Sequence, residues 1–141
     1  MNRREVILMT LAPAKGESHT PVQVQKLLFL IDREISKAIG GPYFNFQPHS
    51  YGPFDKAVYE VLESLAIEGY VDILPQKTWR NYKLTALGQE YGDTLLNTLS
   101  VAAKDYVAKV SRFVRSLSVA ELVSAIYKAY PEMRENSVFQ E

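Results

Sequence analysis

The spacing of apolar residues along the chain predicts six helices and one β-hairpin. In six stretches apolar residues recur every three or four positions, as on one face of an amphipathic helix. These stretches are residues 2–12, 20–39, 53–69, 85–99, 101–116 and 118–130. Two short strand-like runs, residues 71–74 and 80–84, flank a polar tip and predict a hairpin. This order of elements is typical of a mainly α domain with a small β-hairpin wing, a winged helix-turn-helix-like fold.

Helix-capping signals mark the start of two of these helices. Thr20 can cap the second helix, with Pro21 at its first position and Gln23 placed to complete a capping box. Ser118 and Glu121 have the same spacing before the last helix. Both helices are therefore predicted to begin at these residues.

Proline and glycine residues mark where other elements turn, start or weaken. Residues 43–47 alternate and predict a short strand or an extended segment, and residues 48–53 predict a rigid turn. Pro53 is expected to open the third helix. Gly88 and Gly92 are expected to weaken the fourth, because glycine has a low helix propensity.

The elements are expected to form one compact unit with two parts. Residues 1–99 are predicted to form the winged-helix-like domain, and residues 100–141 a helical extension that packs on it. The tail after the last helix is expected to be loosely held, with Met133, Val138 and Phe139 as anchors.

Composition narrows the classes of protein that fit this pattern. The chain has 141 residues, 47% of them hydrophobic, and its sixteen basic residues balance sixteen acidic ones. Neutrality argues against a protein that binds phosphates mainly through a basic excess. No cysteine is present, which excludes disulfides and thiolate metal sites. Glu5 interrupts the apolar run at the start, so a short amphipathic helix is expected there and not a signal peptide. No apolar run is long enough to span a bilayer. We therefore expect a cytoplasmic protein.

The predicted wing tip is one candidate nucleic-acid surface. It carries a cluster of cations beside an aromatic side chain, which can contact phosphate and stack on a base. The residues of this cluster are Lys77, Trp79, Arg80 and Lys83. The alternative is that Trp79 folds back onto the core and the cations are only solvated.

The predicted helices differ in how well they suit DNA. The solvent face of the third helix is mainly acidic and would repel phosphate, which argues against a recognition helix. Its charged residues are Asp55, Lys56, Glu60, Glu63 and Glu68. The fifth helix carries a basic side opposite its apolar side, and the candidates there are Lys109, Arg112 and Arg115. A charge stripe of this kind is also the ordinary solvated face of an amphipathic helix.

The sequence offers little that supports catalysis. His49 lies beside Ser50 and Tyr51 in the predicted turn, where a hydrolase built on His49 is one interpretation and a purely structural turn another. His19 is expected at the surface, and Arg33 is expected to pair with a neighbouring acid. We therefore predict no catalytic residues, no metal site, no cofactor and no small-molecule substrate.

Several segments together resemble a known group of proteins. Residues 24–34, VQKLLFLIDRE, and residues 49–62, HSYGPFDKAVYEVL, are similar to motifs of the SocA-like, or Panacea, antitoxin domain. Both segments also resemble YwgA-like bacterial and archaeal proteins, as do residues 82–88, YKLTALG. Residues 126–133 and 136–137 are similar to the C-terminal end of that second group.

The resemblance implies a small helical domain with a wing, found near toxins, phage genes and defence systems. It implies a non-enzymatic module that binds a toxin or another defence component by direct contact, and it assigns no catalytic residue. The partner surface is expected around Tyr51, Phe54 and Lys56, with the predicted wing tip as the second candidate. The alternative for Tyr51 to Pro53 is a structural role only, since a tyrosine can pack, a glycine can turn and a proline can start a helix.

Two further alternatives concern self-association and DNA binding. The apolar sides of the last two helices either build a homodimer seam or complete a single core. A transcriptional regulator that binds duplex DNA through the wing and the fifth helix is the alternative function. That function would give an affinity that falls steeply with salt.

Overall fold

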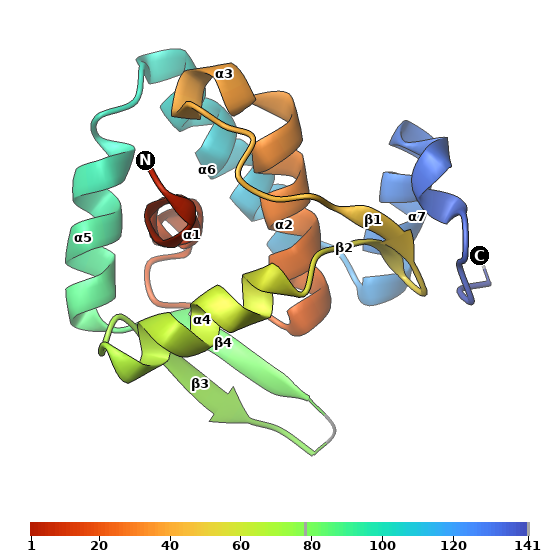
Figure 1. Cartoon of the computed structure of the whole chain (residues 1–141), viewed down its shortest axis with the longest axis horizontal. Helices are drawn as coiled ribbons and strands as arrows, with labels where there is room; N and C mark the ends of the chain where they lie inside the picture. The colour runs from red at the N-terminus through yellow and green to blue at the C-terminus, as the bar shows by residue number, and fades with distance from the viewer. Residues whose placement is uncertain (78, 141) are drawn as a thin grey trace.

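The computed structural model describes residues 1–77 and 79–140, which are mainly helical. The helices are α1 (Arg3–Leu11), α2 (Pro21–Glu34), α3 (Ser36–Ile39), α4 (Ala57–Ile67), α5 (Ala86–Leu96), α6 (Val101–Ser116) and α7 (Val119–Ala129), with 3-10 helices η1 (Ala12–Ala14) and η2 (Pro131–Arg134). The strands β1 (Gln47–His49), β2 (Gly52–Phe54), β3 (Val71–Pro75) and β4 (Arg80–Leu84) pair as antiparallel hairpins, β1–β2 and β3–β4. The predicted fold class is confirmed, with β3–β4 as the wing (Figure 1).

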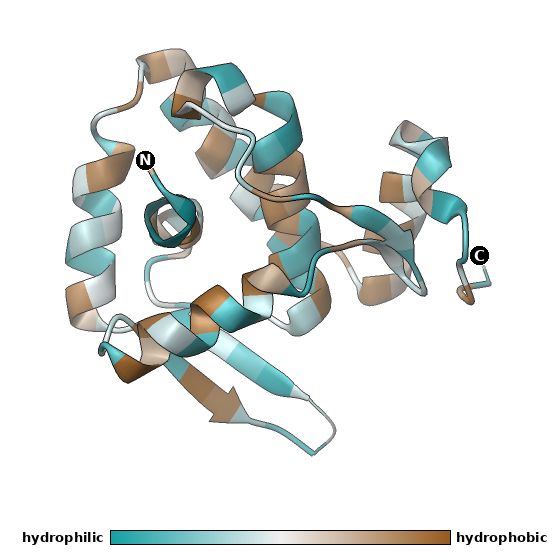
Figure 2. Cartoon of the chain, viewed as in Figure 1, coloured by the Kyte–Doolittle hydropathy of each residue, from teal (hydrophilic) through white to brown (hydrophobic). Residues whose placement is uncertain are grey.

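Helix α1 lies at the centre of the fold. Figure 1 shows it end-on, between α5 and α2 and above α4. Residues 6–11 are at most 1% exposed, and only the hydrophilic first turn reaches solvent (Figure 2). The prediction of an amphipathic first helix is wrong. Helices α2, α4, α5 and α6 all pack against α1, and after the first turn it has no solvent-exposed face.

Helix α2 begins as predicted but ends earlier. The Thr20 hydroxyl accepts a hydrogen bond from the Gln23 N–H at 3.2 Å, and the Gln23 side chain accepts one from the Thr20 N–H at 2.9 Å. The predicted capping box is therefore confirmed. Ile35 leaves helical geometry, with φ −122° and ψ 29°, so the helix breaks there and α3 follows. The predicted continuous helix to residue 39 is wrong at this point.

A second hairpin occupies the segment before α4. The turn predicted over residues 48–53 is part of this β1–β2 hairpin, and Gly52 takes φ +101° there, a conformation that glycine adopts readily. The helix predicted to open at Pro53 begins instead at Ala57. The Asp55 carboxylate accepts a hydrogen bond from the Ala57 N–H at 2.9 Å, which supplies a partner for the first turn of α4.

The wing joins the core through one of its faces. Strands β3 and β4 pair with Val71 opposite Leu84, and Val71, Tyr82 and Leu84 are buried. The predicted hairpin is therefore confirmed. The chain enters α5 directly from β4, where the Thr85 hydroxyl accepts a hydrogen bond from the Gly88 N–H at 3.1 Å and acts as the predicted cap.

Helices α6 and α7 complete the core of the chain. Ser118 and Glu121 form the predicted capping box at the start of α7. The apolar residues on the inner sides of both helices are buried in the same cluster as those of α1 and α2. They include Val107, Val110, Val114, Leu122, Val123 and Ile126. These sides therefore cover the core of the chain itself.

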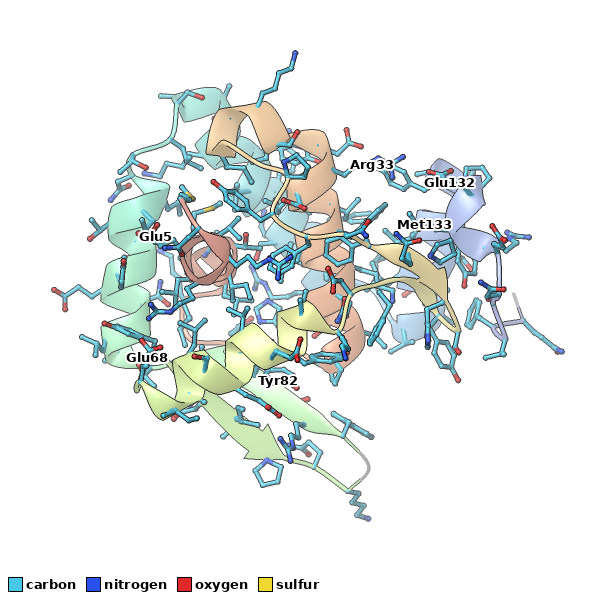
Figure 3. All side chains as sticks on the ribbon, in the orientation of Figure 1. Glu5, Arg33, Glu68, Tyr82, Glu132 and Met133 are labelled. Carbon is cyan, nitrogen blue, oxygen red and sulfur yellow. The ribbon has the colours of Figure 1, made fainter. Side chains whose placement is uncertain are left out.

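An ion pair ties α2 to the C-terminal segment. The Arg33 guanidinium lies 3.0 Å from the Glu132 carboxylate in η2, and Figure 3 shows the two side chains where α2 meets that segment. The guanidinium also lies over the rings of Phe29 and Tyr130, 5.6 and 5.2 Å from their centroids. The sequence predicted that Arg33 pairs with a neighbouring acid. This prediction is wrong, because its partner Glu132 is distant in sequence.

Two glycines of α5 allow close backbone packing, beyond the weakening that the sequence predicts. A Cβ atom on Gly88 would lie 2.0 Å from the Tyr70 carbonyl oxygen. A Cβ atom on Gly92 would lie 2.5 Å from the Leu8 carbonyl oxygen of α1. No side chain fits at such distances, so α5 can approach α1 and the start of the wing only because both residues are glycine.

We expect Gly92→Ala to lower the free energy of unfolding by about 2 kcal/mol or more, because the added methyl forces α5 away from α1. Alanine favours a helix over glycine by about 1 kcal/mol, so the propensity effect has the opposite sign. The matched control is Thr94→Ala, at an exposed position of the same helix. Urea unfolding of both variants measures the effect. A Gly92→Ala protein as stable as the wild type would contradict the packing role.

His19 is buried, so the prediction of a surface residue is wrong. It is 1% exposed, and its backbone exchanges hydrogen bonds with that of Tyr82 in β4 at 2.8 and 2.9 Å. Within residues 1–77 and 79–140, neither ring nitrogen has a hydrogen-bond partner. Burial and then the Arg115 cation lower the pKa of His19 to about 4, while Glu17 opposes them. The neutral imidazole is therefore the form that the fold accommodates.

Acidification is expected to destabilise the protein through His19. The unfolded histidine, with its ordinary pKa of 6.5, takes up a proton before the folded one, so stability is lost as pH falls from 6.5 towards 4. The loss amounts to about 3 kcal/mol. Urea unfolding at pH 7 and pH 4.5 should show a smaller acid loss for His19→Leu than for the wild type. His49→Gln, at an exposed histidine, should retain the wild-type loss; equal losses in all three proteins would refute the assignment.

Candidate functional site

Buried polar side chains of α2 bind the backbone of the segment that leads to α4. The Gln25 amide donates to the Asp55 carbonyl at 2.9 Å and accepts from the Asp55 N–H at 3.0 Å. The Asp32 carboxylate accepts from the N–H groups of Tyr43 and Phe44 at 2.7 and 3.0 Å. These bonds fix both ends of the segment that carries the β1–β2 hairpin against α2.

Lys26, the neighbour of Gln25, is a buried cation beneath this hairpin. Its side chain lies next to Gly52, and a Cβ atom on that glycine would contact Lys26 Cε at 3.4 Å. Lys26 is 3% exposed, and its Nζ donates to the Pro53 carbonyl at 3.3 Å. An ammonium group has three donors, and across the described part of the chain this carbonyl is the one acceptor of Lys26.

The charge of Lys26 has no compensating acid in residues 1–77 and 79–140. The carboxylate of Asp55 is engaged elsewhere, since it accepts from the N–H groups of Ala57 at 2.9 Å and Asn45 at 2.8 Å. Burial lowers the pKa of Lys26 to about 8. Most Lys26 side chains are therefore still protonated at neutral pH, as buried cations without an ion-pair partner.

A cavity of about 280 Å³ lies at Lys26. Its lining residues come from α2, the β1–β2 hairpin and α4. They are Val22, Gln25, Lys26, His49, Ser50, Tyr51, Gly52, Phe54 and Tyr59. Three of the aromatic rings form a continuous wall, with His49 stacked on Phe54 at 4.8 Å and Phe54 edge-on to Tyr59 at 5.8 Å between centroids. The cavity therefore combines an aromatic part of its wall with one buried lysine.

The structure brings together two of the three residues predicted to bind a partner. Tyr51 and Phe54 both line the cavity, and Tyr51 is 48% exposed. Lys56 is exposed before α4 and does not line it. Sequence reasoning missed Lys26, although a lysine inside a run of apolar residues on α2 is a detectable signal.

The C-terminal tail holds the turn of this hairpin. The Val138 N–H donates to the Ser50 carbonyl at 3.0 Å, and the Tyr127 hydroxyl donates to the Ser137 hydroxyl at 2.6 Å. Met133 is buried and Phe139 packs on the core, as predicted for anchors. Val138 holds through its backbone, because its side chain is 65% exposed.

Of the wing residues predicted to bind nucleic acid, one cation lies in an ion pair and the tryptophan is exposed. Trp79 is 48% exposed and its indole N–H donates to Asn81 at 2.8 Å, so the alternative in which it folds onto the core is wrong. Arg80 lies 3.4 Å from Glu63 of α4. Lys77 is exposed and Lys83 is half-buried.

The basic residues predicted on α6 divide between two settings. Arg112 and Arg115 line a cavity of about 300 Å³ together with Lys15 and Lys104, whereas Lys109 is exposed and does not line it. Arg115 also lies 2.9 Å from the Glu17 carboxylate. The cationic cluster around Arg112 is therefore partly neutralised.

A metal site, a membrane-spanning helix and matches to known proteins were each sought. Within the described residues no group of histidine and carboxylate side chains is arranged to hold a metal ion. In the same part of the chain, no helix has both the length and the apolar character needed to cross a membrane. Comparison with protein-family models, with curated proteins and with solved structures found no match.

Replacing the buried lysine by methionine tests its electrostatic cost. Between pH 8 and 10.5 the unfolded lysine retains a proton that the folded one has lost, so wild-type stability rises with pH across this window. The gain from pH 7 to pH 10 is about 2 kcal/mol. We expect Lys26→Met to be at least as stable as the wild type at pH 7 and to lack this gain.

Urea unfolding at pH 7 and pH 10 measures the difference between the two proteins. Tyrosines such as Tyr59, whose pKa burial raises to about 12, contribute equally to both and cancel. The control is Lys56→Met at an exposed lysine, which should retain the wild-type pH dependence. A Lys26→Met protein that is much less stable than wild type at pH 7 would show that the lysine is required for the fold.

Proposed function

We propose that this chain is a non-enzymatic protein-interaction module whose partner docks on the β1–β2 hairpin. The observation that carries this proposal is an exposed tyrosine, Tyr51, at a cavity that holds the uncompensated cation Lys26. The resemblance to SocA-like and YwgA-like proteins supports a toxin or defence component as partner, in the cytoplasm. A second copy of the chain is the other protein partner that the sequence suggests.

The hairpin has properties that suit a docking surface. Tyrosine is enriched among residues that dominate binding energy, since it buries a large area and loses few rotamers. The hairpin is fixed from both sides, by Gln25 through Asp55 and by Val138 through Ser50. A surface that is already ordered loses less entropy on binding, which favours affinity.

Binding of duplex DNA is the second candidate function. The cavity that brings Arg112 and Arg115 together with Lys15 and Lys104 favours it. Against it, Arg115 lies in an ion pair with Glu17. The formal net charge of the chain is zero, and phosphate binding gains most from a basic excess.

Affinity capture from the native lysate, with one half treated with nuclease, separates the two functions. We expect a protein partner that survives nuclease and is identified by mass spectrometry. Its affinity should fall about tenfold or more for Tyr51→Ala, because the docking surface loses its exposed aromatic anchor. The matched control is Trp79→Ala on the wing, since both aromatic side chains are 48% exposed.

Melting curves of both variants control for folding. Unfolding of Tyr51→Ala would support the structural role of the tyrosine instead of docking. Recovery of nuclease-sensitive DNA alone, lost when Lys77, Arg80 and Lys83 are replaced together, would establish the DNA function and refute the protein module.

A further inference from the structure

We propose that the cavity at Lys26 is a carboxylate-binding site, which receives one acidic group of the docked partner on an apolar stem. The inference rests on the proposed function and names the chemistry that the hairpin surface recognises. The acidic group is either a glutamate or aspartate side chain or the free C-terminus of the partner, which share a carboxylate next to apolar atoms.

The hydrogen bonding of Lys26 is the first argument. Of the three donors of its ammonium group, one has an acceptor in the described residues, the Pro53 carbonyl at 3.3 Å. A neutral carbonyl at that distance is a weak partner for a cation, and charge-assisted bonds to carboxylates are shorter and stronger. The ammonium therefore has unused capacity of the kind that a carboxylate satisfies.

The electrostatic cost of Lys26 is the second argument. A buried charge is retained at a cost to stability unless a partner charge compensates it. The carboxylate of Asp55, in the segment that Gln25 binds, accepts from the backbone N–H groups of Ala57 and Asn45, and no described acid forms an ion pair with Lys26. The depressed pKa of about 8 agrees with an ammonium that lacks an anion, and a bound carboxylate would raise it.

The walls of the cavity are the third argument. Phe54, Tyr59 and the ring of His49 form an aromatic surface next to the cation. The volume of about 280 Å³ lies just below the roughly 300–1,000 Å³ of sites for drug-sized ligands. Its size and lining therefore suit a single residue with a carboxylate and an apolar stem.

Binding of three small probes to the isotopically labelled full chain, followed by NMR, tests the site without the partner. N-acetyl-phenylalanine represents a chain terminus, and the α-amide of N-acetyl-glutamate represents an acidic side chain. N-acetyl-phenylalaninamide is the uncharged control. We expect one of the carboxylate probes to saturate with a Kd on the order of 1 mM, and the uncharged probe to bind at least about tenfold more weakly. Whichever carboxylate probe binds identifies the source.

Two variants and a pH change make the test specific. Lys26→Met should weaken the carboxylate probe about tenfold or more, whereas Lys37→Met, at an exposed lysine of α3 outside the cavity, should leave it unchanged. Raising pH from 7 to 9.5 should also weaken binding about tenfold, as the amine loses its proton. Lys26→Gln, which keeps a donor for the Pro53 carbonyl, replaces Lys26→Met if that variant fails to fold.

The outcomes separate this inference from the proposed function. Equal binding of charged and uncharged probes, or binding unchanged in Lys26→Met and Lys26→Gln, overturns the carboxylate site. Absence of binding by both carboxylate probes overturns it as well. Carboxylate binding together with undiminished partner capture by Tyr51→Ala supports the site and refutes docking on the hairpin. Loss of both probe and partner in Lys26→Met, with a wild-type melting curve, supports both.

Discussion

The burial of residues 6–11 of α1 is the constraint on which the rest of the structure depends. A helix that is buried all round after its first turn requires neighbours on every side, and α2, α4, α5 and α6 supply them. Their approach is close enough that α5 needs Gly92 where it passes the Leu8 carbonyl. The wing and the β1–β2 hairpin then lie at the periphery of this core, where their outer residues are free of packing demands.

The polar residues of α2 extend this order from the core to the candidate site. Gln25 and Asp32 are buried, and both use their side chains to satisfy backbone groups of the following segment. A segment with few regular hydrogen bonds of its own is held in this way in one conformation. Lys26 lies between them in the chain and differs from them. It places a charge under the hairpin, and its ammonium has one carbonyl acceptor and no ion pair in the described residues.

The sequence was most informative where local rules decide the structure. The capping boxes of α2 and α7 and the wing follow from residues close together in the chain, and all are present. Burial of residues 6–11 of α1 depends on four other helices, and the local spacing of apolar residues cannot predict it. The candidate site shows the same contrast between local and long-range causes. The motif predicted a role for Tyr51, whereas the position of Lys26 next to Gly52 depends on how the hairpin packs on α2.

The attachment of the tail to the hairpin also determines when, during synthesis of the chain, the hairpin surface can be completed. Proteins are synthesised from the N-terminus, and the hairpin is made long before the residues that hold it. Ser50 receives its backbone hydrogen bond from Val138, and Tyr127 binds Ser137 beside it. The surface around Tyr51 therefore reaches its final form only when nearly ninety further residues have been added after Ser50. The residues that form the wing are therefore synthesised well before the residues that complete this surface, and under the proposed function recognition would begin only after they have been added.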